Sequence, residues 1–319
     1  MRGERNKLCK YILKRLLQLI PVLLGITFLT FTLTYLSPGD PAVLMLTATG
    51  GTPTPQLVEQ VRAGMGLNKP FLTRYGEWLM GVIQGDFGVS YQYSRSVSDL
   101  IISRLPATLE LAGTSLGLMM IVALPLGIIS AFYRNKASDY IIRILSFVGI
   151  SMPSFWLGLL LMYVFSVKLK ILPIMGNSDW SGILLPTVTL ALAMASKYTR
   201  QLMAAILEEI GQDYVIAAKA RGLKDRTILF KHILQKSLIP IVTLLGLSVG
   251  SLLGGAAIVE TIFVWPGVGK LAVEAIFNRD YPLIQGYVVW MALIYVVVNM
   301  VVDISYHLLD PRIHWEKGG

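Results

Sequence analysis

The chain has 319 residues, of which 54% are hydrophobic and 15% charged, and its formal net charge is +9 at pH 7. Soluble globular proteins carry about 25% charged residues, so the composition excludes an ordinary soluble domain and indicates a membrane protein. The basic residues lie between apolar stretches, as in cytoplasmic loops, which argues against nucleic-acid binding. With Cys9 as the single cysteine, an internal disulfide is excluded.

The first apolar run covers 11–36 and follows a cluster of basic residues. It is too long for the core of a signal peptide and lacks a small-residue cleavage site, so we expect a retained membrane helix. Basic residues mark the cytoplasmic side, which predicts a cytoplasmic N-terminus. The section 37–105 is the least hydrophobic long stretch, and we expect it to lie outside. The N-terminal domain would therefore cover 1–105.

Five further apolar stretches complete an expected all-α membrane fold with six transmembrane helices. Pro106 suits the start of a helix, and Pro153 predicts a kink near the middle of another. Basic residues concentrated in a loop over 200–237 place that loop and both termini in the cytoplasm. The expected helices are 106–133, 140–167, 183–198, 238–263 and 282–308, within a membrane domain 106–309 that precedes a tail 310–319.

Residues within these spans are candidates for lining a translocation pathway. Glu110 lies one turn after Pro106, where the helix dipole tolerates an acid; it could contact a cationic substrate or simply reach toward water at the interface. The expected kink at Met152 and Pro153 could adjoin a pathway or serve helix packing alone.

Glycines recur every four residues in the fifth span. These glycines form a stripe without side chains on one face of the helix, which permits close packing against another helix. Alternatively, this face could line a narrow translocation pathway. The residues are Gly246, Gly250 and Gly254.

No motif for catalysis, metal binding or nucleotide binding stands out in the chain. The stretch 265–270 suggests a phosphate loop, but Val264 replaces its first glycine and Leu271 its Ser or Thr. Asp303 and His307 share a helix face with Asn299, yet further metal ligands are lacking nearby. We therefore expect no catalytic residue, no metal site and no cofactor in this chain, and an energy source in another subunit.

A polar, basic island over 212–240 separates two apolar segments. Asp213 is a plausible N-cap and Gly222 a plausible C′ residue, so a short helix over 214–221 is predicted. Its alanines would let another protein approach closely, and so short a helix needs a partner. An ordinary cytoplasmic loop is the alternative. The alanines are Ala217, Ala218 and Ala220, and nearby charges are Lys219, Arg221, Lys224 and Arg226.

The string Asp-Tyr-Val-Ile-Ala-Ala-Lys-Ala-Arg-Gly-Leu over 213–223 resembles the coupling loop of the peptide/nickel family of ATP-binding-cassette (ABC) importer permeases. It departs from the general pattern at Ile216, where that pattern has Glu, and at Leu234-Gln235, where it has Leu-Pro. The resemblance implies that this helix docks into a groove on an ATPase subunit. The implied coupling residues are Asp213, Tyr214, Ala217, Ala218, Lys219, Ala220, Arg221, Gly222 and Leu223.

The resemblance extends over nearly the whole chain, with matching stretches at 64–70, 85–90, 260–269, 278–282 and 309–312. It implies an ABC importer type I transmembrane domain in the inner membrane rather than an enzyme. The implied partners are a second homologous permease, two ATPase subunits that bind ATP and Mg²⁺, and an extracytoplasmic substrate-binding protein that docks on the external region.

The stretches 105–112, 151–156 and 172–175 are most similar to nickel-importing members, which favours nickel, free or chelated, as substrate. Dipeptide or oligopeptide importers share most of these residues and are the alternative. A secondary transporter should show internal repeats with broken helices, and a channel should show a selectivity ring. Neither class accounts for the short docking helix.

Overall fold

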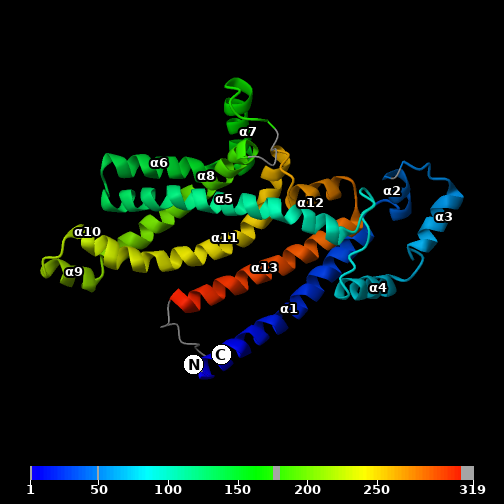
Figure 1. The fold of residues 1–319 in the computed structure, drawn as a ribbon, viewed down its shortest axis with the longest axis horizontal. Helices are drawn as coiled ribbons and strands as arrows, with labels where there is room; N and C mark the ends of the chain where they lie inside the picture. Colours follow the sequence, from blue (N-terminus) through cyan, green and yellow to red (C-terminus); the bar gives the residue numbers. More distant parts are fainter. Residues whose placement is uncertain (1, 49, 175–179, 310–319) are drawn as a thin grey trace. The chain divides into compact units, whose positions relative to one another are not determined.

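A computed structural model describes residues 2–48, 50–174 and 180–309 of the chain, and every named element in these ranges is helical (Figure 1). The all-α prediction is confirmed for this part. The helices divide between two compact units. The first unit comprises residues up to Ala107 together with Gly267–Met300, and the second comprises Thr108–Pro266 and the residues from Val301 onward.

The first unit contains two long helices and several short ones. Aromatic side chains join α1 to α4, since Phe28 packs edge-on against Phe71 with 5.8 Å between ring centres, and Phe31 lies 5.5 Å from Tyr75. The elements are α1 (Arg2–Leu36), α2 (Pro41–Ala48), α3 (Pro55–Gly64), α4 (Phe71–Ile83), the first turns of α5 (Val97–Phe132), α12 (Val268–Phe277) and α13 (Tyr281–Leu309).

A buried aspartate ties the loop before α5 to the start of α13. Asp280 is fully buried and accepts hydrogen bonds from the Ser90 hydroxyl at 2.5 Å and from the Gln92 backbone N–H at 3.1 Å. In the same unit, Val97 and Leu283 are also fully buried in an apolar cluster. These contacts, together with an isolated antiparallel bridge between Val89 and Ser96, hold the region between α4 and α5 in place.

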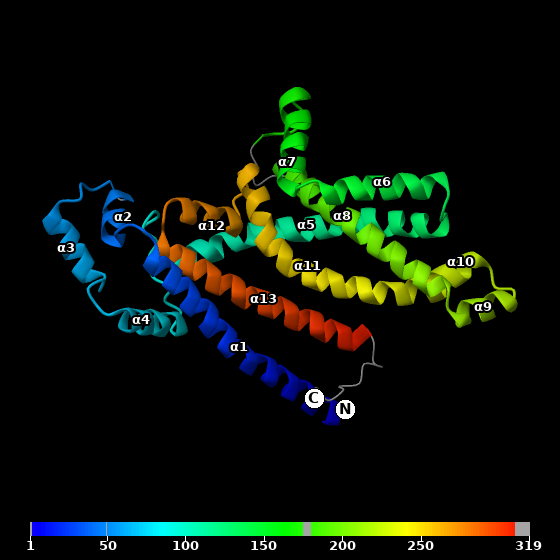
Figure 2. The same cartoon turned by 180° about the vertical axis from the view of Figure 1, so that it is seen from behind.

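The second unit is organised around α8, which packs against α6, α7 and α11 (Figures 1 and 2). Its packing is tight: a Cβ added to Gly149 of α6 would lie 2.1 Å from the Ser196 hydroxyl oxygen of α8. The elements are the rest of α5, α6 (Ala137–Ser151), α7 (Ser154–Met162), the π-helix η1 (Tyr163–Lys168), α8 (Trp180–Ile210), α9 (Asp213–Ala220), α10 (Asp225–Ile228), the π-helix η2 (Leu229–Ile233) and α11 (Leu234–Ile262).

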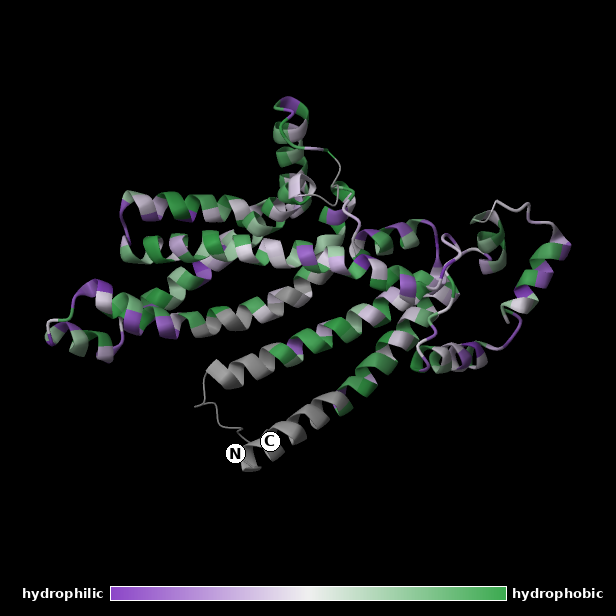
Figure 3. Ribbon diagram, viewed as in Figure 1, coloured by the Kyte–Doolittle hydropathy of each residue, from purple (hydrophilic) through white to green (hydrophobic). Residues whose placement is uncertain are grey.

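Three helical segments in the described part are long and apolar enough to cross a membrane, namely Leu17–Leu36, Val97–Phe132 and Tyr281–Val301. A fourth is added if the bent pair Ala137–Ser151 and Ser154–Lys168 counts as one span. Figure 3 shows hydrophobic residues predominating along α5 and hydrophilic ones gathered at α9 and α10. Helices cover each of the six expected stretches, although their bounds differ, and the number of spans stays a prediction.

Several expected helix bounds were wrong, and α8 in particular continues to Ile210 rather than ending at 198. Helix α5 begins at Val97 rather than at Pro106, which lies inside it. Its first turns are stabilised by burial of Leu100 and Ile101, and Ser96-x-x-Asp99 is a capping-box pattern that could have indicated this start.

The third expected span is not one kinked helix but two helices that meet at 102°. The break falls at Met152, whose ψ of 126° is extended, because a residue before proline avoids the helical conformation.

Candidate functional site

Helix α9 lies at one end of the second unit, between the end of α8 and the start of α10 (Figures 1 and 2). Its N-cap is Gln212, with an extended ψ of 148°, rather than the expected Asp213. Asp213 is instead the first helical residue and is exposed. A carboxylate in the first turn still favours this helix, because it faces the positive end of the helix dipole.

The C-terminus of α9 has the expected glycine geometry. Gly222 has a φ of +77°, a left-handed conformation that other residues adopt at a cost. Its N–H donates to the Lys219 carbonyl at 2.9 Å, and the Leu223 N–H donates to the Ala218 carbonyl at 3.3 Å. These two bonds form a Schellman motif, which satisfies the last carbonyls and ends the helix.

Helix α9 buries one narrow face, and the rest of its surface is exposed. Val215 and Ala218 are buried in an apolar cluster that includes Ile206 of α8 and Ile228 of α10. Ala218 therefore does not belong to an exposed docking surface as expected. Between them Ile216 is 61% exposed, an apolar side chain to which the sequence analysis assigned no role. The outward residues are Asp213, Ile216, Ala217, Lys219, Ala220, Arg221, Gly222 and Leu223.

Tyr214 connects three helices. Its hydroxyl donates to Glu209 Oε2 at 2.5 Å, and the Lys236 ammonium lies 3.7 Å from the centre of its ring. Burial, followed by the hydrogen bond to Glu209, raises the pKa of the Tyr214 phenol, so the hydroxyl stays protonated and remains a donor. Sequence reasoning missed Glu209 and Lys236, because neither belongs to the motif over 213–223.

An exposed ion pair also lies beside α9. Lys219 Nζ is 3.5 Å from Asp225 Oδ1, and both side chains are more than half exposed. Pairs of this kind contribute little to stability. Lys219 and Arg221 thus leave positive charge at the outer surface of α9.

The candidates within the spans do not form one site. Glu110 is exposed on α5, whereas Met152 and Pro153 mark the break between α6 and α7. Gly246 is buried and Gly250 half-buried in α11, and the surroundings of Gly254 lie outside the described residues. No hydrogen bond or ion pair joins any two of these described residues to one another.

A buried acid in α11 was missed as a site residue. Glu260 is fully buried and accepts a hydrogen bond from the Thr108 hydroxyl of α5 at 2.7 Å. The two residues are 152 positions apart, so no local pattern predicts the pair. In the part of the chain that the structure describes, no cluster of three metal-ligating side chains occurs; the side chains of Asp303 and His307 lie outside that part.

Two family models cover most of the chain. Residues 123–315 match the family described as "Binding-protein-dependent transport system inner membrane component". Residues 8–112 match "Binding-prot-dependent transport system membrane comp, N-term".

Full-length relatives agree with these matches. The glutathione transport system permease protein GsiC of Escherichia coli K12 is 39% identical over 306 residues, covering 96% of this chain and 99% of the relative. The protein of the same name from Salmonella typhi is 40% identical over the same share of both chains.

Solved structures agree on the fold. The inward-facing MetNI methionine ABC transporter has a TM-score of 0.56 at 17% identity, over 66% of this chain and 96% of that one. An amino acid ABC transporter with histidines has a TM-score of 0.53 at 18% identity, over 68% and 95%. The chain therefore belongs to the binding-protein-dependent transport system inner membrane components and is a permease subunit of an ABC importer, not an enzyme.

Proposed function

We propose that this permease serves the import of short peptides of the glutathione type, with α9 as the helix that couples it to an ATPase. The observation that carries the substrate class is the 39% identity over 96% of the chain to a permease of a glutathione transport system. These relatives favour the peptide alternative over the nickel substrate that the sequence analysis preferred. Membership of an ABC importer family likewise disfavours a secondary transporter or a channel.

Three features of α9 support the coupling role. The helix exposes Ile216 and Ala217 side by side, which combine an apolar anchor with a small residue that permits close approach. Its buried face is fixed by Val215, and its C-terminus is closed by the Schellman motif at Gly222. A rigid, short helix that exposes an apolar anchor and small residues suits insertion into a groove of a partner protein.

The partners in this proposal are a second homologous permease, two ATPase subunits that bind ATP and Mg²⁺, and an extracytoplasmic substrate-binding protein. The chain lies in the inner membrane with both termini and α9 in the cytoplasm, and α2, α3 and α4 outside. When the ATPases close on ATP, they displace α9. Tyr214 passes the movement to α8 through Glu209 and to α11 through Lys236.

The proposed substrate weakens the case for Glu110 as a residue that contacts substrate in the translocation pathway. An exposed carboxylate suits a cationic substrate, whereas glutathione carries more carboxylate than ammonium groups and is an anion at neutral pH. We therefore assign Glu110 to the membrane interface, where an acid early in a span can reach water.

Uptake into proteoliposomes that contain the complete transporter and its binding protein tests the substrate class. We expect ATP-dependent uptake of labelled glutathione, reduced by excess unlabelled glutathione and unaffected by nickel. A matched preparation that lacks the binding protein provides the background. Nickel uptake that excess peptide does not reduce would overturn the proposed substrate and restore the nickel assignment.

A further inference from the structure

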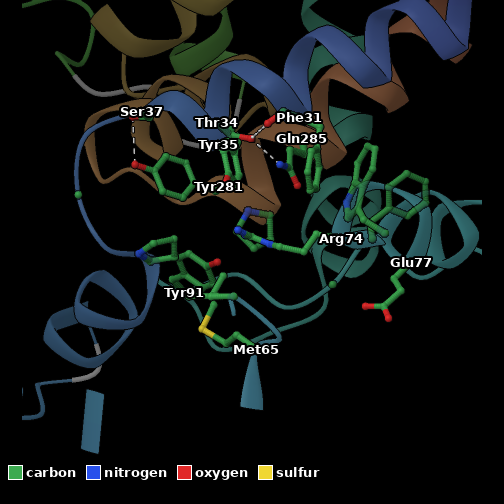
Figure 4. A pocket seen from close by; sticks show the side chains of 17 residues that line it. Phe31, Thr34, Tyr35, Ser37, Met65, Arg74, Glu77, Tyr91, Tyr281 and Gln285 are labelled. Atoms are coloured by element: carbon green, nitrogen blue, oxygen red, sulfur yellow. Dashed lines mark hydrogen bonds between the residues drawn. The ribbon is translucent and has the colours of Figure 1, made fainter. Parts of the chain in front are cut away.

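A cavity of about 350 Å³ lies inside the first unit, where the end of α1 meets the start of α13 (Figure 4). Six of its 17 lining residues are aromatic, among them Tyr35 from α1, Trp78 from α4, Tyr91 from the loop before α5 and Tyr281 from α13. The volume falls at the lower end of the range for ligand sites, about 300–1,000 Å³, and such sites are typically apolar with few polar groups. The cavity is separate from α9, which belongs to the second unit.

The cavity lies at the ends of two membrane-crossing segments. Leu17–Leu36 ends, and Tyr281–Val301 begins, at residues beside it. The two helix ends are joined directly, since Tyr281 donates to the Ser37 hydroxyl at 3.0 Å and Gln285 donates to the Thr34 hydroxyl at 2.6 Å. In a bilayer this is the depth at which hydrocarbon gives way to lipid headgroups and at which aromatic belts occur.

Arg74 supplies a positive charge to the cavity. Its side chain extends from α4 into the space near Tyr91, Tyr281 and Gln285 (Figure 4). The guanidinium carbon lies 5.3 Å from the centre of the Tyr35 ring, which is within cation–π distance. None of the ion pairs recorded for the described residues includes Arg74.

One acid, Glu77, lines the cavity; its carboxylate pairs with Lys69 at 2.6 Å, which offsets its negative charge in part. The nearby Asp280 accepts the Ser90 hydroxyl at 2.5 Å. A guanidinium among aromatic walls is stabilised by an anion that can take its hydrogen bonds. The cavity therefore favours a negatively charged ligand.

Tyr91 offers a second donor. Burial, and then the negative charge of Asp280, raises the pKa of the Tyr91 phenol, so the hydroxyl remains protonated. A protonated phenol beside a guanidinium can donate a hydrogen bond to an oxyanion. Because the phenol is neutral, it does not repel the negative charge of that anion.

We propose that this cavity binds the phosphate of a membrane phospholipid. The fork of N–H groups on Arg74 matches the oxygens of a phosphodiester, and the Tyr91 hydroxyl supplies a further hydrogen bond. For the acyl chains, the membrane-crossing segment of α1 presents exposed apolar side chains at Leu33 and Leu36. Leu36 is the neighbour in sequence of the cavity residues Tyr35 and Ser37.

Native mass spectrometry of the complete, delipidated transporter titrated with phosphatidylglycerol tests this site. We expect Arg74→Gln to weaken lipid binding about tenfold, the change that loss of a charge-assisted hydrogen bond produces. Arg74→Lys should fall between wild type and Arg74→Gln, because an ammonium keeps the charge but loses the fork. Arg95→Gln is the matched control, since Arg95 is an exposed arginine of the same unit that does not line the cavity.

Two soluble probes distinguish the source of the anion. Excess glycerol 3-phosphate or glutathione should leave phosphatidylglycerol bound, because neither has acyl chains to contact α1. Displacement of the lipid by either compound at matched concentration would overturn the lipid assignment. Equal affinity of wild type and Arg74→Gln would overturn it as well. If Arg74→Gln fails to assemble, Tyr91→Phe gives the same test, with several-fold weaker binding expected and unchanged binding contradicting the proposal.

Discussion

Tyr214 donates a hydrogen bond to Glu209 across the turn between α8 and α9, with 2.5 Å between the two oxygens. The Lys236 ammonium lies 3.7 Å from the centre of the Tyr214 ring. The Tyr214 side chain therefore joins α9 to the end of α8 and to the first turn of α11. Both long helices contribute to the core of the second unit. A displacement of α9 would therefore be transmitted to both helices through Tyr214.

Replacing Tyr214 with Phe should uncouple transport from ATP hydrolysis. The ring and its contact with Lys236 remain, while a hydrogen bond to a charged acceptor, worth about 1.5–3 kcal/mol, is lost. We expect more ATP hydrolysed per substrate imported by the reconstituted transporter. Tyr140→Phe, which changes an exposed tyrosine of α6, is the control. An unchanged ratio for Tyr214→Phe would show that this hydrogen bond plays no part in coupling.

Asp139 should be important for the stability of the second unit. This fully buried carboxylate accepts hydrogen bonds from the Ser130 hydroxyl at 2.5 Å, the Asn135 backbone N–H at 2.9 Å and Arg143 Nε at 2.7 Å. Asp139→Ala leaves these donors without their acceptor, which should cost about 2–3 kcal/mol after allowance for the partly exposed arginine.

A thermal melt of the purified protein in detergent measures this loss. Asp225→Ala, which breaks an exposed pair, should leave the melting temperature unchanged. Equal melting temperatures for the two variants would contradict the importance assigned to Asp139.

The sequence predicted those features that depend on local pattern. Apolar runs predicted the long helices, and the position of Gly222 predicted the end of α9. The inward orientation of Ala218 and the outward one of Ala217 could not be read from the motif, because α9 is short and has no clear apolar face. Proline chemistry predicted a bend at Pro153, but its size of 102° depends on packing against α8.

Contacts between distant residues lay beyond sequence reasoning. Asp280 and Ser90 are separated by 190 positions, and Glu260 and Thr108 by 152. Each pair is buried, and the folded chain alone brings its members together. The cavity around Arg74 could not be predicted for the same reason, since its walls come from five separate stretches of the chain.

Gly286 should be intolerant of a side chain. A Cβ at this position would lie 2.4 Å from Val97 Cγ1 and 3.5 Å from the Phe87 Cβ. Because valine has little rotamer freedom, Gly286→Ala should force a backbone shift and cost roughly 1–3 kcal/mol of stability. Gly76→Ala is the control: apart from its chain neighbours and the backbone of its own helix, no atom lies within 4 Å of the added methyl, and alanine favours a helix interior by about 1 kcal/mol. Melting temperatures that move in the same direction would contradict this packing.

Alkaline pH should weaken the contact between Tyr93 and Glu274. The Tyr93 hydroxyl donates to Glu274 Oε2 at 3.0 Å, and burial, then this hydrogen bond, raises the pKa of Tyr93 from 10.0 to about 12. Because the folded pKa is the higher one, the stabilisation is fully present below the unfolded value and is lost as pH rises through the folded value.

The difference in melting temperature between wild type and Tyr93→Phe, followed across this range, measures the effect. We expect the wild type to be more stable at neutral pH and its advantage to shrink between about pH 10 and 12. If the difference in melting temperature stayed constant over that interval, ionisation of Tyr93 would not break its contact with Glu274, contrary to this prediction.

The docking of α9 on the ATPases is tested most directly by co-purification of those subunits with an affinity-tagged permease. Ala217→Arg places a long charged side chain on the exposed face of α9 beside Ile216 and leaves the buried residues untouched. The control Ala217→Ser keeps the surface small. We predict that Ala217→Arg inserts normally and loses the ATPases, whereas Ala217→Ser retains them. Retention of the ATPases by Ala217→Arg, at the level of wild type, would contradict the coupling role of α9.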